Sequence, residues 1–234
     1  ATLRLPTLWV ALKRWAVRMT ALRLVGAVAV AFALAGWPLR AGDVAIEPAN
    51  RLSPDAPAWR DLVAKFAQQP DTLADFEEQR FFPFRKDPVV LRGEVRVSPA
   101  RGLSLRYTAP EERVMILDTA GVLVRDAAGQ QTPPDARAAA ANRALLHVLR
   151  LDFAALEKDF EVYGRRDDYA WSLALVPRDE GLSRSIGNIF VSGETTSVRT
   201  IVLRRSAKQH IDIVITTPRA TAAFSADEVK KYYR

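Results

Sequence analysis

The sequence predicts a mainly β protein with a few helices, an α+β fold whose antiparallel strands form a barrel-like sheet. Residues 73–126 alternate between apolar and polar side chains over several short stretches, each ended by a turn, which is typical of strands with one solvated face. The alternation resumes after residue 160 and continues to residue 215. An alanine-rich helical stretch separates the two β regions, so we expect one sheet interrupted by helices.

Two hairpins are predicted within the first β region. In residues 91–98 the apolar or small side chains share one parity and the charged or polar ones the other, and the alternation restarts after the turn of residues 99–102. Residues 114–117 and 122–125 flank a second turn. The strand before them, residues 73–82, alternates poorly, which is typical of a sheet edge.

Helices are predicted on both sides of this region. Residues 54–69 carry an apolar stripe that would pack on the sheet, formed by Trp59, Leu62, Val63 and Phe66. Residues 135–160 predict a helical hairpin, with Asp135 as the N-cap of its first helix and a second helix beginning at Asp152. One face of the first helix carries Ala138, Ala141, Leu145 and Leu149.

The second β region predicts a further series of strands, separated by polar turns. They are residues 161–163, 169–175, 189–191, 198–203 and 211–215. Residues 225–228 then match a capping box, in which a serine side chain and a glutamate three positions later satisfy the first backbone N–H groups of a helix. We therefore expect a short C-terminal helix.

Most of the net charge lies near the N terminus. The formal charge of the chain is +7, from 34 basic and 27 acidic residues. Residues 1–41 hold six of the basic residues and no acid, so the remainder carries 28 bases against 27 acids. A nearly neutral domain has no sequence-wide electrostatic footprint for phosphate, and we expect no nucleic-acid partner.

The N-terminal stretch resembles a secretory signal peptide. Residues 24–35 are uncharged, follow several basic residues and end in a small-x-small pattern, which predicts cleavage after Ala35 or Ala41. A membrane anchor is the alternative, but a spanning helix needs roughly 20 apolar residues. Met19 stands where a natural start is expected, so residues 1–18 can be interpreted as an upstream extension. Residues 42–234 are predicted to form a single domain.

The residues that usually carry catalysis or metal binding are scarce. The chain has no cysteine, which excludes disulfides, zinc-thiolate sites and cysteine nucleophiles. Its two histidines, His147 and His210, have no histidine or cysteine partner at i+2 or i+4, and no phosphate-binding glycine motif occurs. Adjacent acids such as Glu77 and Glu78 would point to opposite faces of a strand. We expect neither a metal site, nor a cofactor, nor an enzyme.

Several stretches together resemble the periplasmic outer-membrane lipoprotein carrier family LolA. In chain order they are LADFEEQ at 73–79, GEVRV at 93–97, LSLRYTAP at 103–110, ILDTAGVL at 116–123, NRALL at 142–146 and WSLALVP at 171–177. Each motif is short, but their order and spacing extend the similarity over most of the chain after the predicted signal peptide.

The resemblance implies an incomplete antiparallel β-barrel covered by a helical lid, above an apolar cavity that takes acyl chains. The helices of residues 54–69 and 135–160 would then be the barrel cover and the lid. Candidate cavity residues on the matching elements are Phe76, Val95, Val97, Leu103, Leu105, Tyr107, Leu145, Leu149, Trp171 and Leu173.

The resemblance also implies a latch. In this family an arginine after the G-x-x-x-V strand bonds the lid and helps to gate it. Counting back from Pro110 puts that position on Pro99, with Arg101 two residues further on and on the same strand parity. Arg101 is therefore the candidate lid latch.

The function implied by the resemblance is a monomeric periplasmic carrier that shields the acyl chains of lipoproteins, or another lipid. It would take its cargo from an inner-membrane donor complex and deliver it to an outer-membrane acceptor. Two alternatives stay open from the residues: a paralogue serving lipid or polyene-pigment transport, and a non-carrying structural or assembly protein with a filled β core. A small transmembrane barrel fits poorly, because a helical stretch interrupts the strands and many strands carry charges.

Overall fold

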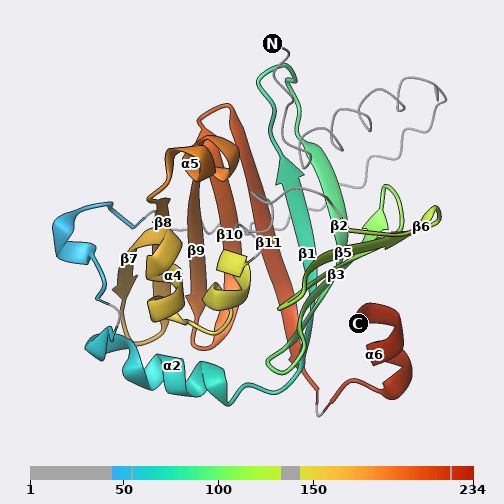
Figure 1. Cartoon of the computed structure of the whole chain (residues 1–234), viewed down its shortest axis with the longest axis horizontal. Helices are drawn as coiled ribbons and strands as arrows, with labels where there is room; N and C mark the ends of the chain where they lie inside the picture. Colours follow the sequence, from blue (N-terminus) through green and yellow to red (C-terminus); the bar gives the residue numbers. More distant parts are fainter. Residues whose placement is uncertain (1–43, 54, 133–142, 222) are drawn as a thin grey trace, which may run out of the picture.

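The computed structural model of the chain describes residues 44–53, 55–132, 143–221 and 223–234. Eleven antiparallel strands form one open sheet in the order β6-β5-β4-β3-β2-β1-β11-β10-β9-β8-β7. Strands β3 to β6 turn out of the plane of β7 to β11, so the sheet curls without closing (Figure 1). The predicted fold class, an incomplete antiparallel barrel with helices over it, is confirmed.

The elements follow the predicted chain order, with β6 and α5 in addition. The strands are β1 (Thr72–Arg80), β2 (Val89–Ser98), β3 (Gly102–Ala109), β4 (Arg113–Asp118), β5 (Gly121–Asp126), β6 (Gly129–Gln131), β7 (Phe160–Arg166), β8 (Ala170–Pro177), β9 (Asn188–Glu194), β10 (Ser197–Ser206) and β11 (Gln209–Ala220). The helices are η2 (Pro48–Asn50), η3 (Pro57–Trp59), α2 (Arg60–Ala67), α4 (Phe153–Asp159), α5 (Glu180–Ile186) and α6 (Ala226–Tyr232). Residues 143–148 are also helical and precede α4.

Strand β1 lies in the centre of the sheet, between β2 and β11, so the predicted edge position is wrong. The strand alternates poorly because Glu78 and Arg80 point to the same inner side as Ala74 and Phe76, and all four are buried. Arg80 donates a hydrogen bond to the Glu78 carboxylate, and the Tyr107 hydroxyl donates to Glu78 Oε2 at 2.7 Å. Buried charges are tolerated when they are paired in this way.

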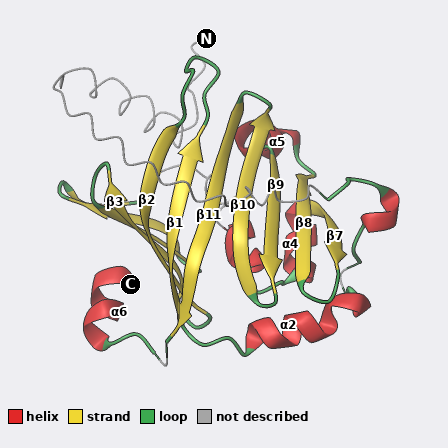
Figure 2. Ribbon diagram, turned by 180° about the vertical axis from the view of Figure 1, so that it is seen from behind, coloured by secondary structure: helices red, strands yellow, loops and turns green. Residues whose placement is uncertain are grey.

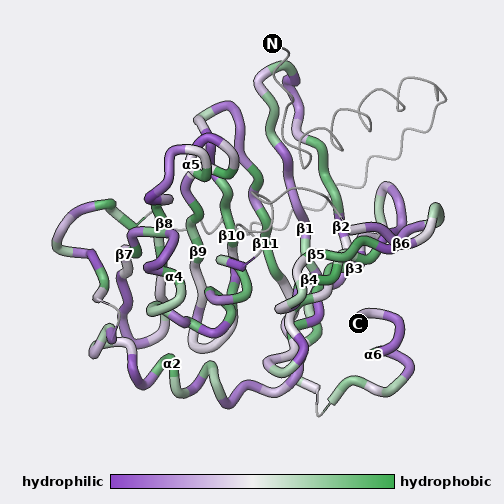
Figure 3. Tube along the Cα trace, viewed as in Figure 1, coloured by the Kyte–Doolittle hydropathy of each residue, from purple (hydrophilic) through white to green (hydrophobic). Residues whose placement is uncertain are grey.

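Helices cover the inner face of the sheet (Figure 2). Helix α2 buries Leu62 and Phe66 from the predicted stripe, and its hydrophobic residues are interleaved with hydrophilic ones along the helix (Figure 3). Trp59, just before α2, meets Phe153 of α4 edge-on with ring centroids 5.4 Å apart. The Asp152 side chain accepts from the N–H of Ala155, which starts α4 where it was predicted.

Two adjoining hydrophobic clusters fill the interior. The helix-covered core lies under α2 and α4 on strands β7 to β10, and its residues include Trp59 and Trp171. The strand core lies mainly on β1 to β5. The helical residues 143–148 join the two cores, because Val148 belongs to the first and Leu146 to the second, and Leu149 packs against both.

The outer face of the hairpin formed by β2 and β3 is only partly solvated, in contrast to the predicted wet face. Arg92 is exposed, but Arg96 is buried because its guanidinium lies 3.8 Å from the ring centroid of Tyr232 in α6. The predicted C-terminal helix and its capping box, formed by Ser225 and Glu228, are confirmed. The C-terminal segment packs on the outer side of β4 and β5, which the strand pattern alone does not reveal.

Some predictions fall outside the described residues. They are the signal peptide of residues 1–41 and the start of the alanine-rich helix, with Asp135, Ala138 and Ala141. The division into a signal peptide and one domain therefore stays a prediction. None of the described helices combines the length and the apolar content that a membrane-spanning helix requires.

Candidate functional site

An apolar cavity of about 90 Å³ lies between the inner face of the sheet and the helices. Strands β1, β2, β3, β10 and β11 form one wall, and residues 145–149 with the end of α2 form the other. The polar lining residues gather at one end of the cavity, which we call the rim: Gln69, Thr72, Thr196 and Ser197. Pockets for small molecules usually measure roughly 300–1,000 Å³, so in this conformation the cavity is nearly closed.

The structure brings most of the predicted cavity residues together. Those that line the cavity are Phe76, Val95, Val97, Leu103, Leu105, Leu145 and Leu149. On the strands they lie on the inner parity, and the last two come from the helical hairpin. Leu105 and Leu149 are only partly buried, because they border the residual space.

Trp171 and Leu173 lie in the helix-covered core and do not border the cavity. The Trp171 ring occupies the space that a side chain at residue 193 would fill, because a Cβ built on Gly193 would lie 2.2 Å from it. The ring also meets Phe66 edge-on at 5.7 Å, and its Nε1–H donates to the carbonyl of Thr195 at 3.0 Å. Phe66 therefore stands between Trp171 and the cavity.

Tyr107 is also buried outside the cavity lining, in the strand core. Its hydroxyl is bound to Glu78, and the guanidinium of Arg113 lies 4.4 Å from its ring centroid. Burial and the Glu78 carboxylate raise the pKa of Tyr107, so the hydroxyl stays protonated and keeps donating. Burial opposes the charge on Arg80, but the Glu78 carboxylate and Tyr107 together outweigh it, so the pKa of Arg80 is raised.

Two hydrogen bonds close the cavity near its rim, and we call them the rim clasps. The side-chain amide of Gln69, just after α2, donates to the carbonyl of Thr196 in the turn between β9 and β10. On the hairpin side, Arg150 Nη2 donates to the carbonyl of Pro99 in the turn between β2 and β3, at 3.1 Å. Each clasp ties a helical segment to a turn of the sheet. Neither was predicted, because a side-chain contact to a distant carbonyl leaves no pattern in the sequence.

Arg101, the predicted latch, does not bind the described part of the hairpin. Its side chain is exposed, and within the described residues it makes no hydrogen bond to residues 143–159. The contact runs in the opposite direction, because the hairpin supplies the arginine, Arg150, and the sheet supplies the acceptor, Pro99. The resemblance assigned the family's arginine to position 99. The backbone carbonyl at this position contacts the hairpin, although no arginine stands there.

The sequence interpretation missed a second group of cavity residues. They are Phe66, Ala74, Val148, Val198, Ile201, Ile213, Ile215 and Pro218. Most share the inner parity of strands that were predicted correctly, so the signal was present in the alternation. Which of many inward apolar residues border a cavity depends on how the helices dock, and this is not encoded locally.

The two histidines and the possible metal ligands were the remaining candidates for chemistry. No group of three or more histidine, cysteine, aspartate or glutamate side chains in this part of the chain could hold a metal ion. His147 Nδ1 lies 3.3 Å from Asp152 Oδ2 within the hairpin. The His210 ring stacks on Phe81 with centroids 4.2 Å apart. Both histidines thus make structural contacts.

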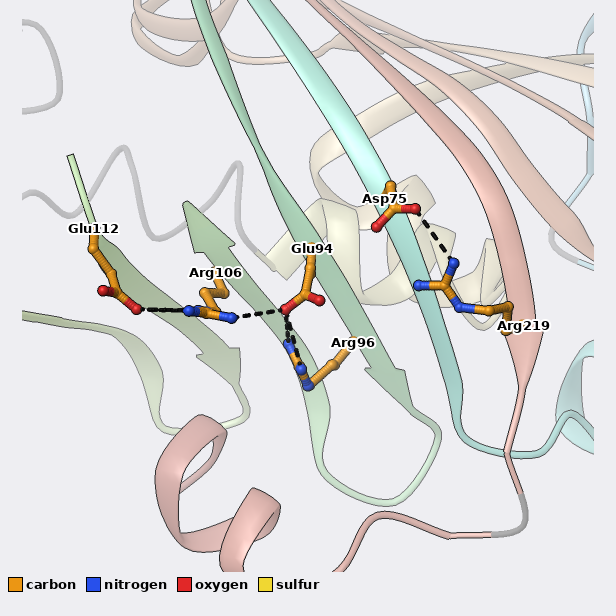
Figure 4. A network of polar contacts seen from close by, with 6 residues as sticks. All are labelled: Asp75, Glu94, Arg96, Arg106, Glu112 and Arg219. Atoms are coloured by element: carbon orange, nitrogen blue, oxygen red, sulfur yellow. Dashed lines mark hydrogen bonds and ion pairs between the residues drawn. The ribbon is translucent and has the colours of Figure 1, made fainter. Parts of the chain in front are cut away.

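A larger groove of about 480 Å³ lies on the outer face of the sheet and is lined mostly by charged and polar side chains. Its charges are paired with one another or with side chains beside the groove (Figure 4). The pairs drawn there are Arg96 with Glu94 at 3.2 Å, Arg106 with Glu94 at 3.3 Å, Arg106 with Glu112 at 2.9 Å and Arg219 with Asp75 at 3.3 Å. A paired polar surface of this kind is a poor environment for an acyl chain, so the smaller inner cavity is the candidate site.

Comparisons with known proteins agree with this architecture. Residues 53–232 match the family described as outer membrane lipoprotein carrier protein LolA-like. A comparison with curated proteins found no match.

Solved structures with a similar fold include a chain of the Pseudomonas aeruginosa MucA/MucB complex, at 16% identity and a TM-score of 0.43, with 75% of this chain and 60% of that chain covered. This chain therefore spans less than two thirds of that relative. A LolA superfamily protein from Nitrosomonas europaea is similar at 8% identity and a TM-score of 0.39, with 73% of this chain and 96% of that chain covered. Identities and scores this low carry no functional argument. The family match extends over most of the chain, and we conclude that the chain belongs to the LolA-like family of outer membrane lipoprotein carrier proteins.

Proposed function

We propose that this protein is a periplasmic carrier that shields the acyl chains of lipoproteins, or of another lipid, and delivers them towards the outer membrane. The observation that carries the proposal is the apolar cavity between the sheet and the helical hairpin, with Leu105 on one wall and Leu149 on the other. Membership of the LolA-like family supports a carrier role, and the predicted signal peptide supports a periplasmic location.

The chemistry of the cavity suits an acyl chain. Its lining is aliphatic and aromatic except at the rim, so it offers few partners to a polar ligand. At ~0.8 kcal/mol for each buried methylene group, a chain of roughly fourteen carbons would gain about 10 kcal/mol on burial. An open cavity with that affinity would hold its cargo too firmly for a shuttle.

Closure of the empty cavity provides a way to release cargo. With about 90 Å³ of space left, an acyl chain can enter only if the hairpin moves away from the sheet. The chain must then displace Leu145 and Leu149, which pack against the sheet in the empty form. The free energy of that packing is subtracted from the gain on binding, so the net affinity falls to a level that permits transfer.

The rim clasps are the contacts that opening would break first. Gln69 and Arg150 bind backbone carbonyls near the protein surface, where a hydrogen bond contributes about 1 kcal/mol net from a neutral donor and about 2 kcal/mol from a charged one. Contacts this weak can break and re-form readily. They favour the closed form without locking it.

In this proposal the protein acts as a monomer and has a binding role but no catalytic one. An inner-membrane donor complex would supply the acylated cargo and an outer-membrane acceptor would receive it. Support for a binding role comes from the two histidines, His147 and His210, which are both occupied by structural contacts.

A second candidate is a non-carrying structural or assembly protein. The observation that favours it is the small volume of the cavity, because the two cores already fill most of the interior. A protein with a filled interior would bind no acyl chain. Acyl-chain binding is therefore the property that distinguishes the two functions.

Lipid binding by matched glutamate variants tests the proposal. Leu105→Glu places a charge in the cavity, whereas Val214→Glu places one on the outer face of β11, where Val214 is 45% exposed. Native mass spectrometry of protein purified from cells should find lipid on the wild type and on Val214→Glu, and none on Leu105→Glu. Titration with a fluorescent fatty acid should give the same order of binding.

Leu149→Glu supplies a second cavity variant on the helical side, in case Leu105→Glu does not fold by circular dichroism. A folded wild type that carries no lipid and binds no fatty acid would contradict the carrier proposal and favour the filled core. Equal binding by the cavity variants and Val214→Glu would also contradict it, because the cargo would then lie elsewhere.

A further inference from the structure

The loop between β1 and β2 presents an exposed aromatic side chain that neither core uses. This tip loop, residues 81–88, has the sequence Phe-Phe-Pro-Phe-Arg-Lys-Asp-Pro. Phe84 is 65% exposed, more than any other phenylalanine among the described residues. A single exposed apolar side chain is common on protein surfaces, so the ring alone does not identify a contact, and its support and surroundings decide what it can bind.

The tip loop holds Phe84 in a defined position. The N–H of Arg85 donates to the carbonyl of Phe82 at 3.1 Å, which closes a turn with Pro83 and Phe84 at its two central positions. The ring of Phe82 supports that of Phe84 with centroids 5.3 Å apart. Since Pro83 already restricts the backbone, a contact made by Phe84 costs little further conformational entropy.

The base of the tip loop is fixed to the sheet. The N–H of Phe81 donates to the carbonyl of His210 at 2.9 Å, and the two rings stack. The loop therefore continues the direction of β1 and β2 and projects beyond the end of the sheet, next to the turn between β10 and β11 (Figure 1).

Basic side chains surround the exposed ring. Arg85 and Lys86 follow Phe84 directly and are exposed, and among the described residues neither forms an ion pair. Lys208, in the neighbouring turn before β11, is exposed as well. Asp87 is the acid within the loop, so these residues carry a net positive charge.

We propose that the tip loop docks the protein on a lipid bilayer that bears anionic headgroups. Aromatic rings favour the interface between headgroups and acyl chains, and Phe84 is placed to enter it. Arg85, Lys86 and Lys208 would lie at the level of the phosphates, where each basic residue is attracted to an anionic surface. A single projecting ring among flexible basic side chains suits a fluid surface that needs no shaped groove.

Docking by the tip loop leaves the cavity rim free. The rim includes Thr72 at the start of β1, while the tip loop follows Arg80 at its end. Nine residues of strand separate the two by about 30 Å at roughly 3.3 Å per residue. This surface contact does not depend on the proposed carrier function, because no cavity residue takes part in it.

Vesicle co-sedimentation of the protein purified from cells tests the docking surface. Phe84→Ser is compared with Tyr169→Ser, which removes an aromatic side chain that is 76% exposed in the turn between β7 and β8. Both variants keep the same N terminus, so any lipid contact made by residues outside the described structure cancels in the comparison. The vesicles contain phosphatidylcholine alone or a mixture with phosphatidylglycerol.

We expect the wild type and Tyr169→Ser to bind phosphatidylglycerol vesicles equally, with weaker binding at high salt. Phe84→Ser should bind roughly tenfold more weakly, because it loses the burial of a phenylalanine ring. The double variant R85E/K86E should lose most of the binding to phosphatidylglycerol vesicles. Circular dichroism should show the same melting temperature for all of them, since the substituted side chains are exposed.

Equal binding by Phe84→Ser and Tyr169→Ser would overturn the proposal, as would failure of the wild type to bind phosphatidylglycerol vesicles. Sedimentation velocity tests whether a second copy of the chain, instead of a bilayer, covers the tip loop. A wild-type dimer that Phe84→Ser dissociates, without vesicle binding by the wild type, would show that a second copy covers the loop.

Discussion

The helix-covered core and the strand core have similar residues but are packed differently. Both cores contain rings that meet edge-on, but in the helix-covered core the ring of Trp171 also fills the space beside Gly193. In the strand core, aliphatic side chains such as Leu105 are only partly buried, and the residual space of the cavity lies beside them. The strand core also holds a buried charge cluster, which includes Glu78.

The difference indicates that the two halves of the sheet have different roles. Most of the helix-covered core is packed between α2, α4 and the strands, and only its edge, at residues such as Phe66 and Val148, borders the cavity, so it is suited to holding the fold together. One wall of the strand core faces the hairpin. An acyl chain could contact the apolar side chains of this wall as well as the hairpin does. Stability therefore should depend most on the first core and cargo binding on the second.

The largest effect is expected from Trp171→Ala. Its ring has no solvent-exposed side, and the neighbouring Phe66 and Gly193 cannot fill the space it leaves. Loss of a large aromatic side chain from such a site typically lowers the free energy of unfolding by about 4 kcal/mol. Urea denaturation followed by circular dichroism measures the change. A loss below 1 kcal/mol would show that this core is not tightly packed.

Glu78→Gln is expected to have the next largest effect. The substitution removes the carboxylate that Arg80 and Tyr107 both bind, and leaves a buried guanidinium without its counter-charge. Removing one partner of a buried pair typically costs about 3 kcal/mol.

The double variant E78M/R80M is the matched control, because it removes both charges. We expect it to unfold at a higher urea concentration than Glu78→Gln. If the double variant were less stable than Glu78→Gln, the ion pair itself would stabilise the strand core, and the loss in Glu78→Gln could not be explained by an unpaired charge alone.

Leu173→Ala and Leu105→Ala compare the two cores directly. Leu173 is completely buried in the helix-covered core, whereas Leu105 borders the cavity. We expect losses of about 3 kcal/mol and about 1 kcal/mol in the free energy of unfolding, because truncation beside existing space creates less new cavity. Equal losses in urea denaturation would remove the distinction between the cores.

The smallest effect is a pH dependence at the edge of the helix-covered core. Asp61 at the start of α2 binds Arg166 of β7 at 2.6 Å, and hydrogen bonds from Arg166 lower the pKa of Asp61 to about 2. Because the folded pKa is depressed, the contribution of this carboxylate to stability is present above pH ~4 and is lost as the pH falls towards 2. Asp61→Asn should therefore melt slightly below the wild type at pH 6, and the difference should vanish near pH 2. A difference that persists at pH 2 would point to a cause other than the ion pair.

Much of the fold could be predicted from the alternation, because side chains on a strand point to opposite faces with a period of two. This placed the β2 and β3 hairpin and the inner residues Val95 and Leu105 correctly. It failed at β1, where Glu78 and Arg80 are inward charges whose partner Tyr107 lies on another strand. The capping box predicted α6, but the alternation did not show that this helix covers Arg96 on the outer face.

The candidate cavity was harder to predict than the strands around it. Parity identifies inward residues, but Trp171 and Leu105 share that parity, and only the docking of α2 and the hairpin separates core from cavity. The clasp at Pro99 involves a carbonyl, which every residue carries. The resemblance pointed to the turn that carries Pro99, but it did not point to Arg150, the side chain that binds this turn.

The central claim is that the hairpin must leave the sheet before an acyl chain can enter. The chain has no cysteine, so the pair R101C/R150C introduces two thiols, one on the turn that carries Pro99 and one at the clasp of the hairpin. A short cleavable bis-maleimide should join them without altering any cavity residue, and the two single-cysteine variants treated with the same reagent serve as controls.

Uptake of a fluorescent fatty acid is then measured before cross-linking, after cross-linking and after cleavage. The account predicts that cross-linking abolishes uptake, that cleavage restores it, and that the single-cysteine controls are unaffected. Equal uptake by the cross-linked and cleaved protein would contradict the account, because the cavity would then fill without movement of the hairpin.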